Sequence, residues 1–233
     1  MSIFDMVIIS RQRVLFFLID TSSSMSGTKI EAVNTTIQEV VPYLREVDAV
    51  DVDVDVDLKI AVMRFSTEAE WITASGPVAI GQFSWKNITT GGETNLGAAC
   101  KELNVKLSKG SSFIQAAGGS CAPLIFLFLG GSPTDDIDSS INELWKNNWF
   151  RQSKKVAVDI GKNANKDVLE HFTGNSDSVV DFCSAEMIQV ICEDALKVGA
   201  IRSDQADVIE KSRRMALKEK LDKIRKDTTE GGW

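Results

Sequence analysis

The chain alternates between short, unbroken runs of apolar residues and longer segments in which apolar residues recur every three or four positions. Residues 14–19 (Val-Leu-Phe-Phe-Leu-Ile) and 124–129 (Leu-Ile-Phe-Leu-Phe-Leu) contain no polar side chain. Such runs are typical of strands buried on both faces of a sheet. Residues 29–44 instead carry apolar side chains at helical spacing. The chain therefore predicts parallel strands joined by helices.

The same two patterns continue along the rest of the chain. They predict strands over residues 58–65, 68–73, 155–160 and 179–182. They predict helices over residues 96–107, 137–148, 165–172 and 185–198. After a tight turn at Ser66 and Thr67, the strand over 68–73 is expected to return antiparallel at the edge of the sheet. These elements predict an α/β fold: a doubly wound, Rossmann-like, mostly parallel sheet with one antiparallel edge strand and helices on both faces.

The region between the first helix and the second strand gives two further expectations. The first helix is expected to reach about Val47, but Pro42 lies inside it and predicts a kink or an early end near Val41. Residues 48–57 then alternate Asp with Val over most of their length. This alternation predicts a strand with one acidic face or an extended acidic segment that leads into the second strand.

The character of the chain changes near residue 200. We expect a main domain over residues 1–200, and a charged helix and tail over residues 201–233. Within this tail, residues 203–227 predict an amphipathic helix with a wide polar face. Its apolar positions, among them Val208, Met215 and Ile224, are too sparse to predict deep burial in a core. The helix either lies along the domain surface or forms an arm that binds a partner or a second copy.

Composition narrows the possible functions. The 233 residues carry a formal net charge of −7, which argues against broad nucleic-acid binding. No apolar run is long enough to span a membrane, and residues 1–12 lack a signal-peptide layout. The single His171 argues against a His-based triad or zinc site and predicts a packing role. The four cysteines lack zinc spacing and predict buried thiols in a reducing, cytoplasmic setting: Cys100, Cys121, Cys183 and Cys192.

A carboxylate and several hydroxyls directly follow the first strand. Asp20 ends the apolar run, and Ser22 and Ser24 follow at intervals of two, so a loop can turn their oxygens toward one point. In open α/β sheets, ligands bind at the carboxyl ends of strands. A carboxylate with hydroxyls, and no His or Cys nearby, suits Mg²⁺, Mn²⁺ or Ca²⁺. The alternative is that these residues only cap the following helix.

Two later loops have a similar character. Residues 89–97 are rich in glycine and hydroxyl groups and precede a predicted helix. In this loop, Thr94 or Asn95 either caps that helix or meets the first loop. Residues 130–136 (Gly-Gly-Ser-Pro-Thr-Asp-Asp) follow the buried strand over 124–129.

Over residues 13–198, the order of elements and the three loops resemble the von Willebrand factor A family. That family holds a divalent cation in a metal-ion-dependent adhesion site (MIDAS). The site uses Asp-x-Ser-x-Ser in the first loop, a Thr in a Gly-rich second loop and an Asp after a later buried strand. The resemblance implies that Asp20, Ser22, Ser24 and Thr94 bind Mg²⁺, Mn²⁺ or Ca²⁺. It also implies that an acidic residue of a partner protein fills an open position on the ion.

Several stretches resemble more closely the tellurium-resistance-associated TerY-like bacterial proteins. These stretches are residues 18–22, 29–34, 94–99 and 133–136. Proteins of that kind are found beside kinase- and phosphatase-like partners in bacterial stress systems. The resemblance therefore implies a cytoplasmic signalling complex in a tellurite or related stress response.

The third loop departs from the family pattern, which usually reads Asp-Gly-x-Pro-Thr-Asp-Asp. Alignment on residues 133–136 places Gly130 at the position of the family's Asp. The missing carboxylate removes one negative charge from the rim of the site, where charge counts most. Asp135 could compensate, although it and Asp136 also suit a helix N-cap. We expect that Gly130→Asp would tighten cation binding.

Three functions remain open from the sequence. The first is a non-enzymatic protein-binding module that uses the cation. The second is a degenerate scaffold that binds partners without metal, which the glycine at position 130 favours. The third is a metal-dependent phosphohydrolase, for which the sequence shows no second metal cluster and no phosphate-binding loop. We expect the first, and no enzymatic activity.

Overall fold

The computed structural model describes residues 11–50, 56–108, 111, 113–114, 120–181, 184–197, 216, 219–224 and 226. A mostly parallel sheet lies at its centre, in the strand order β3-β2-β1-β5-β6-β7. Its parallel strands are β1 (Arg11–Asp20), β2 (Val56–Phe65), β5 (Leu124–Leu129), β6 (Lys154–Asp159) and β7 (Val179–Val180). Two short strands, β3 (Ala69–Trp71) and β4 (Val78–Ala79), pair antiparallel with β2. The predicted fold class is confirmed, with β4 as an additional antiparallel strand.

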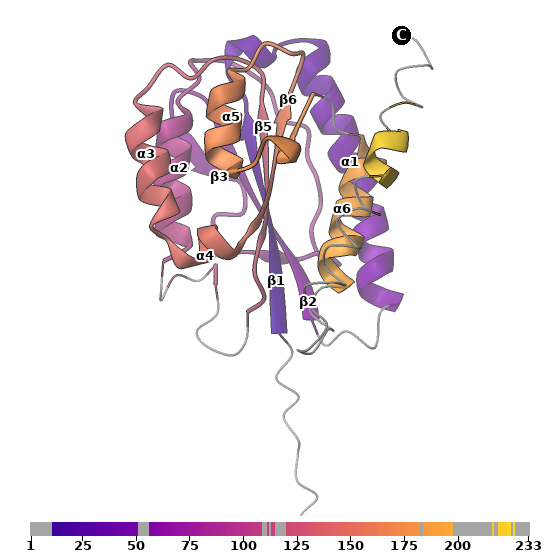
Figure 1. The fold of residues 1–233 in the computed structure, drawn as a ribbon. Helices are drawn as coiled ribbons and strands as arrows, with labels where there is room; N and C mark the ends of the chain where they lie inside the picture. The colour runs from indigo at the N-terminus through magenta and orange to yellow at the C-terminus, as the bar shows by residue number, and fades with distance from the viewer. Residues whose placement is uncertain are drawn as a thin grey trace, which may run out of the picture.

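Helices cover both faces of the sheet (Figure 1). One face carries α2 (Leu96–Lys106), α3 (Ile137–Trp145), α4 (Asn148–Gln152) and α5 (Lys166–Thr173). The other carries α1 (Thr28–Val50) and α6 (Ala185–Lys197). Two 3₁₀ turns complete the elements: η1 (Ser23–Met25) and η2 (Ser176–Ser178). No helix in these described ranges combines the length and apolarity needed to cross a membrane.

The inner strands are buried on both faces, which explains their unbroken apolar runs. In β1, Phe16 and Leu18 belong to the core beneath α2, α3 and α5, whereas Leu15 and Phe17 belong to the core beneath α1 and α6. Successive side chains of a strand point to opposite faces, so one continuous run supplies both cores.

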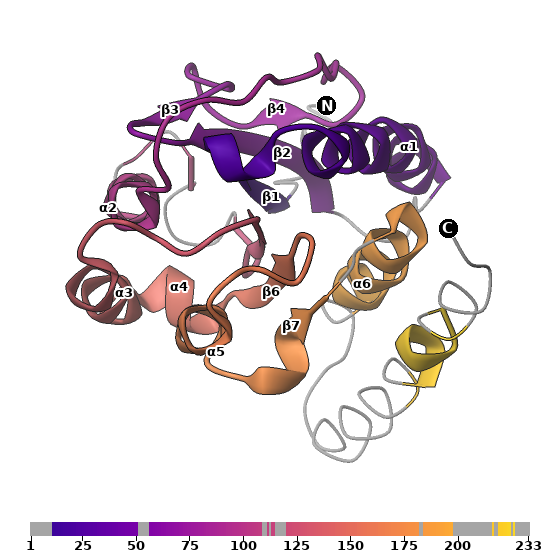
Figure 2. The same cartoon turned by 90° about the horizontal axis from the view of Figure 1, so that it is seen from above.

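The strand order places a topological switch at β1. The chain passes from β1 to β2 on one side, and the next long strand, β5, pairs with the other side of β1. In such sheets a crevice opens above the carboxyl ends of the two strands that flank the switch. Figure 2 looks onto this edge of the sheet, between the two helical layers.

The first helix differs from its prediction. It runs through Pro42 to Val50, so the early end near Val41 is wrong. Pro42 lies on the solvent side, where a carbonyl that loses its helical partner can bind water, and Val41 and Leu44 anchor the helix to the core. The expected acidic strand is also wrong for residues 48–50, which belong to this helix. Residues 51–55 lie outside the described part of the chain.

The helix expected over residues 137–148 is divided into two. It ends at Trp145, and a short helix begins at Asn148. The break has a local cause, because the Asn147 side chain accepts hydrogen bonds from the backbone N–H groups of Trp149 (2.9 Å) and Phe150 (3.4 Å). Asparagine in this position starts a new helix rather than continuing the old one.

Part of the charged C-terminal segment is described. Residues 216, 219–224 and 226 are helical. Ile224 is only 8% exposed and belongs to the core cluster that α1 and α6 line, and Leu221 packs against that cluster. The expectation of no deep burial is therefore wrong at Ile224, while Val208 and Met215 lie outside the described residues. This packing favours a helix that lies along the domain over a separate arm.

We predict that Ile224→Ser destabilises the whole domain. Loss of this buried side chain should lower the free energy of unfolding by about 2–3 kcal/mol, because it leaves a cavity and a polar group in the core. Thermal unfolding followed by circular dichroism should show a melting temperature lower by about 4–10 °C. Lys223→Ser changes the exposed neighbour and serves as the control. Equal melting temperatures for the two variants would show that the segment is not part of the fold.

Candidate functional site

The Asp20 carboxylate joins two of the three loops at the carboxyl edge of the sheet. Asp20 is the last residue of β1 and is fully buried. Its Oδ1 accepts a hydrogen bond from the Ser22 backbone N–H (2.8 Å), and its Oδ2 accepts one from the Gly130 N–H (3.0 Å). These two bonds fix the carboxylate between the first and third loops, and each oxygen keeps a second lone pair.

The two predicted serines of the first loop lie together. The 3₁₀ turn η1 brings the Ser22 and Ser24 Oγ atoms to 2.8 Å, within hydrogen-bond distance. Ser22 is buried and Ser24 is exposed, so the pair leads from the core to the surface. Ser23 lies between them in sequence, but its Oγ donates instead to the Gly92 carbonyl (3.1 Å).

Thr94 of the second loop faces the same point as Ser24. A Cβ atom added to Gly131 would lie 2.6 Å from Ser24 Oγ and 3.8 Å from Thr94 Oγ1. Both hydroxyls therefore face the bare Cα of Gly131. Thr94 is only 5% exposed, and in the described part of the chain its hydroxyl makes no hydrogen bond.

The alternative role of Thr94 or Asn95 as a side-chain cap of α2 is not what the structure shows. Asn95 occupies the N-cap position, but its side chain makes no capping hydrogen bond. Its Nδ2 donates to the Thr67 carbonyl (2.9 Å), and its Oδ1 accepts from Thr134 Oγ1 (2.8 Å). The Thr94 hydroxyl is thereby left available for another partner.

Backbone hydrogen bonds hold the three loops against one another. Gly91 N–H donates to the Thr21 carbonyl (2.7 Å), which joins the second loop to the first. Thr134 N–H donates to the Thr94 carbonyl (2.9 Å), which joins the third loop to the second. The hydroxyls of the candidate site are thus carried by a preformed framework.

Asp135, the additional candidate ligand, is engaged elsewhere. Its Oδ1 accepts from the Gly97 N–H (3.0 Å) and its Oδ2 from the Ala98 N–H (2.9 Å), so it caps the first turn of α2. Asp136 caps α3, where its Oδ1 accepts from the Ser139 N–H (3.4 Å). Asp136 therefore has the N-cap role that the sequence also allowed, whereas Asp135 caps a different helix from outside it.

The donor set fits a hard cation but is weakly charged. Ser22, Ser24 and Thr94 offer neutral oxygens, and Asp20 offers the carboxylate beside them. Within the described residues no group of three or more His, Cys, Asp or Glu side chains is arranged to hold a metal. A divalent ion bound here would thus depend on hydroxyl oxygens and on ligands from outside the chain.

The place of the missing third-loop carboxylate is partly filled. A Cβ added to Gly130 would lie 2.1 Å from the sulfur of Met25, which is fully buried. On the other side of the same residue, the Lys29 ammonium donates to the Gly130 carbonyl (2.8 Å). Neither neighbour was expected from the sequence, because each reaches position 130 only through the packing of the loops.

Sequence reasoning also missed Asp159. This residue ends β6, pairs in register with Leu129 of β5 and is fully buried. Its Oδ1 accepts from the Ala164 N–H (3.0 Å), whereas its Oδ2 is buried with no hydrogen-bond partner among the described residues. A buried carboxylate oxygen in this state is a place for an ordered water. The signal in the sequence was a single Asp at the end of an apolar strand.

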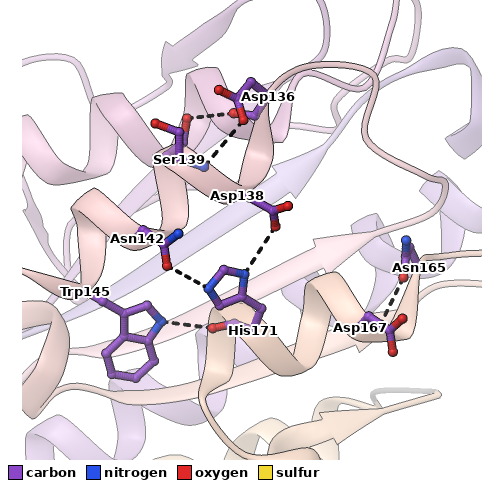
Figure 3. Close-up of polar contacts among 9 residues, drawn as sticks. Asp136, Asp138, Ser139, Asn142, Trp145, Asn165, Asp167 and His171 are labelled. Atoms are coloured by element: carbon purple, nitrogen blue, oxygen red, sulfur yellow. Dashed lines mark hydrogen bonds and ion pairs between the residues drawn. The ribbon is translucent and has the colours of Figure 1, made fainter.

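The only histidine lies in a different place, between α3 and α5 (Figure 3). His171 Nε2 lies 3.1 Å from Asn142 Oδ1, and Nδ1 lies 3.5 Å from Asp138 Oδ1. The Trp145 indole N–H donates to the His171 carbonyl (2.9 Å). These contacts join two helices on the surface of the domain, which agrees with the expected packing role.

Comparisons with known proteins establish the fold. No protein-family model matches the chain, and no curated protein matches it in sequence. Its structure is similar to a von Willebrand factor type A protein from Catenulispora acidiphila (14% identity, TM-score 0.53, 82% of this chain and 42% of that chain). It is also similar to the ArnB paralog VWA2 from Sulfolobus acidocaldarius (17% identity, TM-score 0.52, 83% of this chain and 46% of that chain).

A third similar structure contains a metal. Proximal thread matrix protein 1 from the mussel byssus, with a zinc-occupied MIDAS motif, has 14% identity and a TM-score of 0.53 over 82% of this chain and 46% of that chain. This chain thus spans less than half the length of each of these three proteins. At such identities the likeness shows that the domain has the von Willebrand factor A fold, as the resemblance implied.

We predict that Gly130→Asp and Met25→Ala interact. Gly130→Asp alone should lower the free energy of unfolding by about 1–3 kcal/mol, because its Cβ meets the Met25 sulfur. Met25→Ala alone should cost about 2–5 kcal/mol as a buried truncation. In denaturant unfolding, the double variant should lose less than the sum of the two, since the shortened side chain makes room.

Cation binding gives the second measurement for these variants. The expected gain in Mn²⁺ affinity from the new carboxylate should appear in the double variant relative to Met25→Ala. Additive destabilisation, with no gain in affinity, would mean that position 130 is not the position of the missing ligand.

Proposed function

We propose that this protein is a non-enzymatic protein-binding module that holds a divalent cation at its three loops and binds an acidic residue of a partner protein there. The Ser22, Ser24 and Thr94 oxygens bind the ion directly, and Asp20 binds it directly or through water. The observation that carries this proposal is the convergence of Ser24 and Thr94 on the bare Cα of Gly131, with Ser22 in contact with Ser24.

The charge of the donor set accounts for the choice of partner group. The three hydroxyls are neutral and Asp20 supplies one negative charge, so a divalent ion would keep an excess positive charge. Mg²⁺ and Mn²⁺ prefer oxygen ligands, and a carboxylate neutralises this excess at a partly exposed rim. When bound, the ion would therefore supply the charge that a Glu or Asp of the partner recognises. The zinc-occupied MIDAS of the mussel protein supports a divalent ion in this fold without fixing which one.

An interaction module also fits the described residues better than a phosphohydrolase. A second metal cluster is missing from the described ranges, and His171 makes its contacts between α3 and α5. Hydroxyls held beside a single carboxylate can bind an ion but offer no paired general acid and base.

A metal-free scaffold is the second candidate, and the surroundings of Gly130 favour it. Met25 occupies the space beside this glycine, and the Lys29 ammonium binds its carbonyl. The lysine charge lowers the affinity of the site for a cation, and the methionine fills the space that a ligand side chain at position 130 would need. In that case the same loops would bind a partner through their hydroxyls and the lysine.

The cellular setting is proposed from the sequence resemblance. The TerY-like stretches support a bacterial tellurite or stress-response complex with a kinase- or phosphatase-like partner. The free cysteines support a cytoplasmic setting, and Cys100 and Cys192 are buried as expected, whereas Cys121 is only half-buried. Burial raises the pKa of the Cys192 thiol to about 12, which keeps this thiol protonated and unreactive.

We predict that Ser24→Ala and Thr94→Ala each weaken Mn²⁺ binding. Each variant removes one oxygen of the proposed set, which should raise the dissociation constant about tenfold or more in isothermal titration calorimetry. Ser23→Ala is the matched control, because its hydroxyl lies in the same loop but binds the Gly92 carbonyl. Wild-type protein that binds neither Mn²⁺ nor Mg²⁺ at millimolar concentration would contradict the metal-dependent function and leave the metal-free scaffold.

A further inference from the structure

One basic side chain contacts the third of the three loops. Lys29 belongs to the first turn of α1, and its Nζ donates to the Gly130 carbonyl (2.8 Å). The N–H of the same Gly130 donates to Asp20 Oδ2 (3.0 Å). Gly131, the next residue, faces the Ser24 and Thr94 hydroxyls. The ammonium therefore lies next to the third-loop position at which the family pattern has a carboxylate.

The side chain of Lys29 is held in place by the loop that follows β6. Gly161, which follows β6, has a φ of +86°, and a Cβ added to it would lie 2.6 Å from Lys29 Cε and 3.3 Å from Nζ. The bare glycine backbone thus packs directly on the end of the lysine. Lys29 is half-buried between this loop and Gly130, so its charge has a defined position rather than a free range of rotamers.

Lys29 forms no ion pair with the described residues, and the ion pairs that are present join other residues. Asp20 forms no ion pair with Lys29, and both of its oxygens accept backbone N–H groups. Lys162, the residue after Gly161, is exposed and adds a second positive charge to that loop.

We propose that Lys29 is a specificity-determining residue that binds the partner's carboxylate at this site. A lysine ammonium has three N–H donors, and one of them is used on the Gly130 carbonyl. The other donors can bind a Glu or Asp side chain through charge-assisted hydrogen bonds. The same charge repels a divalent cation, so this site combines weak metal affinity with direct recognition of an acidic residue.

This inference rests on the proposed function, because it assigns the same three loops as the partner-binding surface, but it does not require that the ion is bound. Two probes separate metal binding from carboxylate binding by Lys29. Mn²⁺ alone reports on the metal, by calorimetry. Acetate reports on carboxylate recognition, by NMR titration of the Gly130 and Gly131 backbone amides in the presence of a chelator.

The test compares Lys29→Met with Lys59→Met. Lys59 lies in strand β2, six residues before its end, and is therefore about 20 Å from the loops. Lys29→Met should abolish the saturable acetate shifts and tighten Mn²⁺ binding by roughly threefold to tenfold. Lys59→Met, which changes the net charge equally, should change neither. Lys29→Arg keeps the charge and should retain the acetate response.

Each outcome decides one of the two ideas. Acetate shifts that persist in Lys29→Met, or Mn²⁺ affinity that stays equal or falls, would overturn the role of Lys29 while leaving a Ser24-dependent metal site intact. Acetate shifts that depend on Lys29 in a protein without Mn²⁺ affinity would support Lys29 and reject the metal. If Lys29→Met does not fold by circular dichroism, Lys29→Gln replaces it, and acetate shifts that persist in that variant contradict the proposal.

Discussion

The pair of hydrogen bonds on the Asp20 carboxylate is the constraint on which the rest of the site depends. One bond fixes the first loop through the Ser22 N–H, and the other fixes the third loop through the Gly130 N–H. Asp20 can do this because β1 is the central strand and β5 is its direct neighbour at the topological switch. A carboxylate buried here without these donors would carry a large desolvation cost. The hydroxyls of the loops then take their positions from this anchored framework.

Most of the fold could be predicted because the relevant signals are local. Unbroken runs such as residues 124–129 need burial on both faces, and their alternation with helical patterns leaves few topologies. The errors arose where tertiary packing decides. Pro42 stays inside α1 because the residues around it pack on the core, and Ile224 is buried because α1 and α6 form a surface for it. Neither partner surface can be read from the segment itself.

The residues of the candidate site also fall into those with a local sequence signal and those placed by tertiary packing. Asp20, Ser22 and Thr94 follow strand ends or begin helices, so their position at one edge could be predicted from the strand pattern alone. Lys29 and Met25 could not, because each acts on Gly130, more than one hundred residues away in the chain. Such contacts depend on how closely two segments approach in the folded protein. The glycine at position 130 permits a close approach, but it does not indicate which residue makes it.

The loss of one carboxylate changes what kind of site this is. A loop with Asp at position 130 would place two carboxylates around the ion, whereas here Asp20 is the acid of the set and Lys29 adds the opposite charge beside it. At the separation of neighbouring side chains, even a screened unit charge changes the affinity for a divalent ion severalfold. The same change favours an incoming carboxylate by a similar factor. In the proposed function, metal binding and partner binding would therefore be opposed at Lys29, although at the hydroxyls the two would support one another. On the proposed function, a site of this composition would gain affinity for an acidic partner while depending less on the ion.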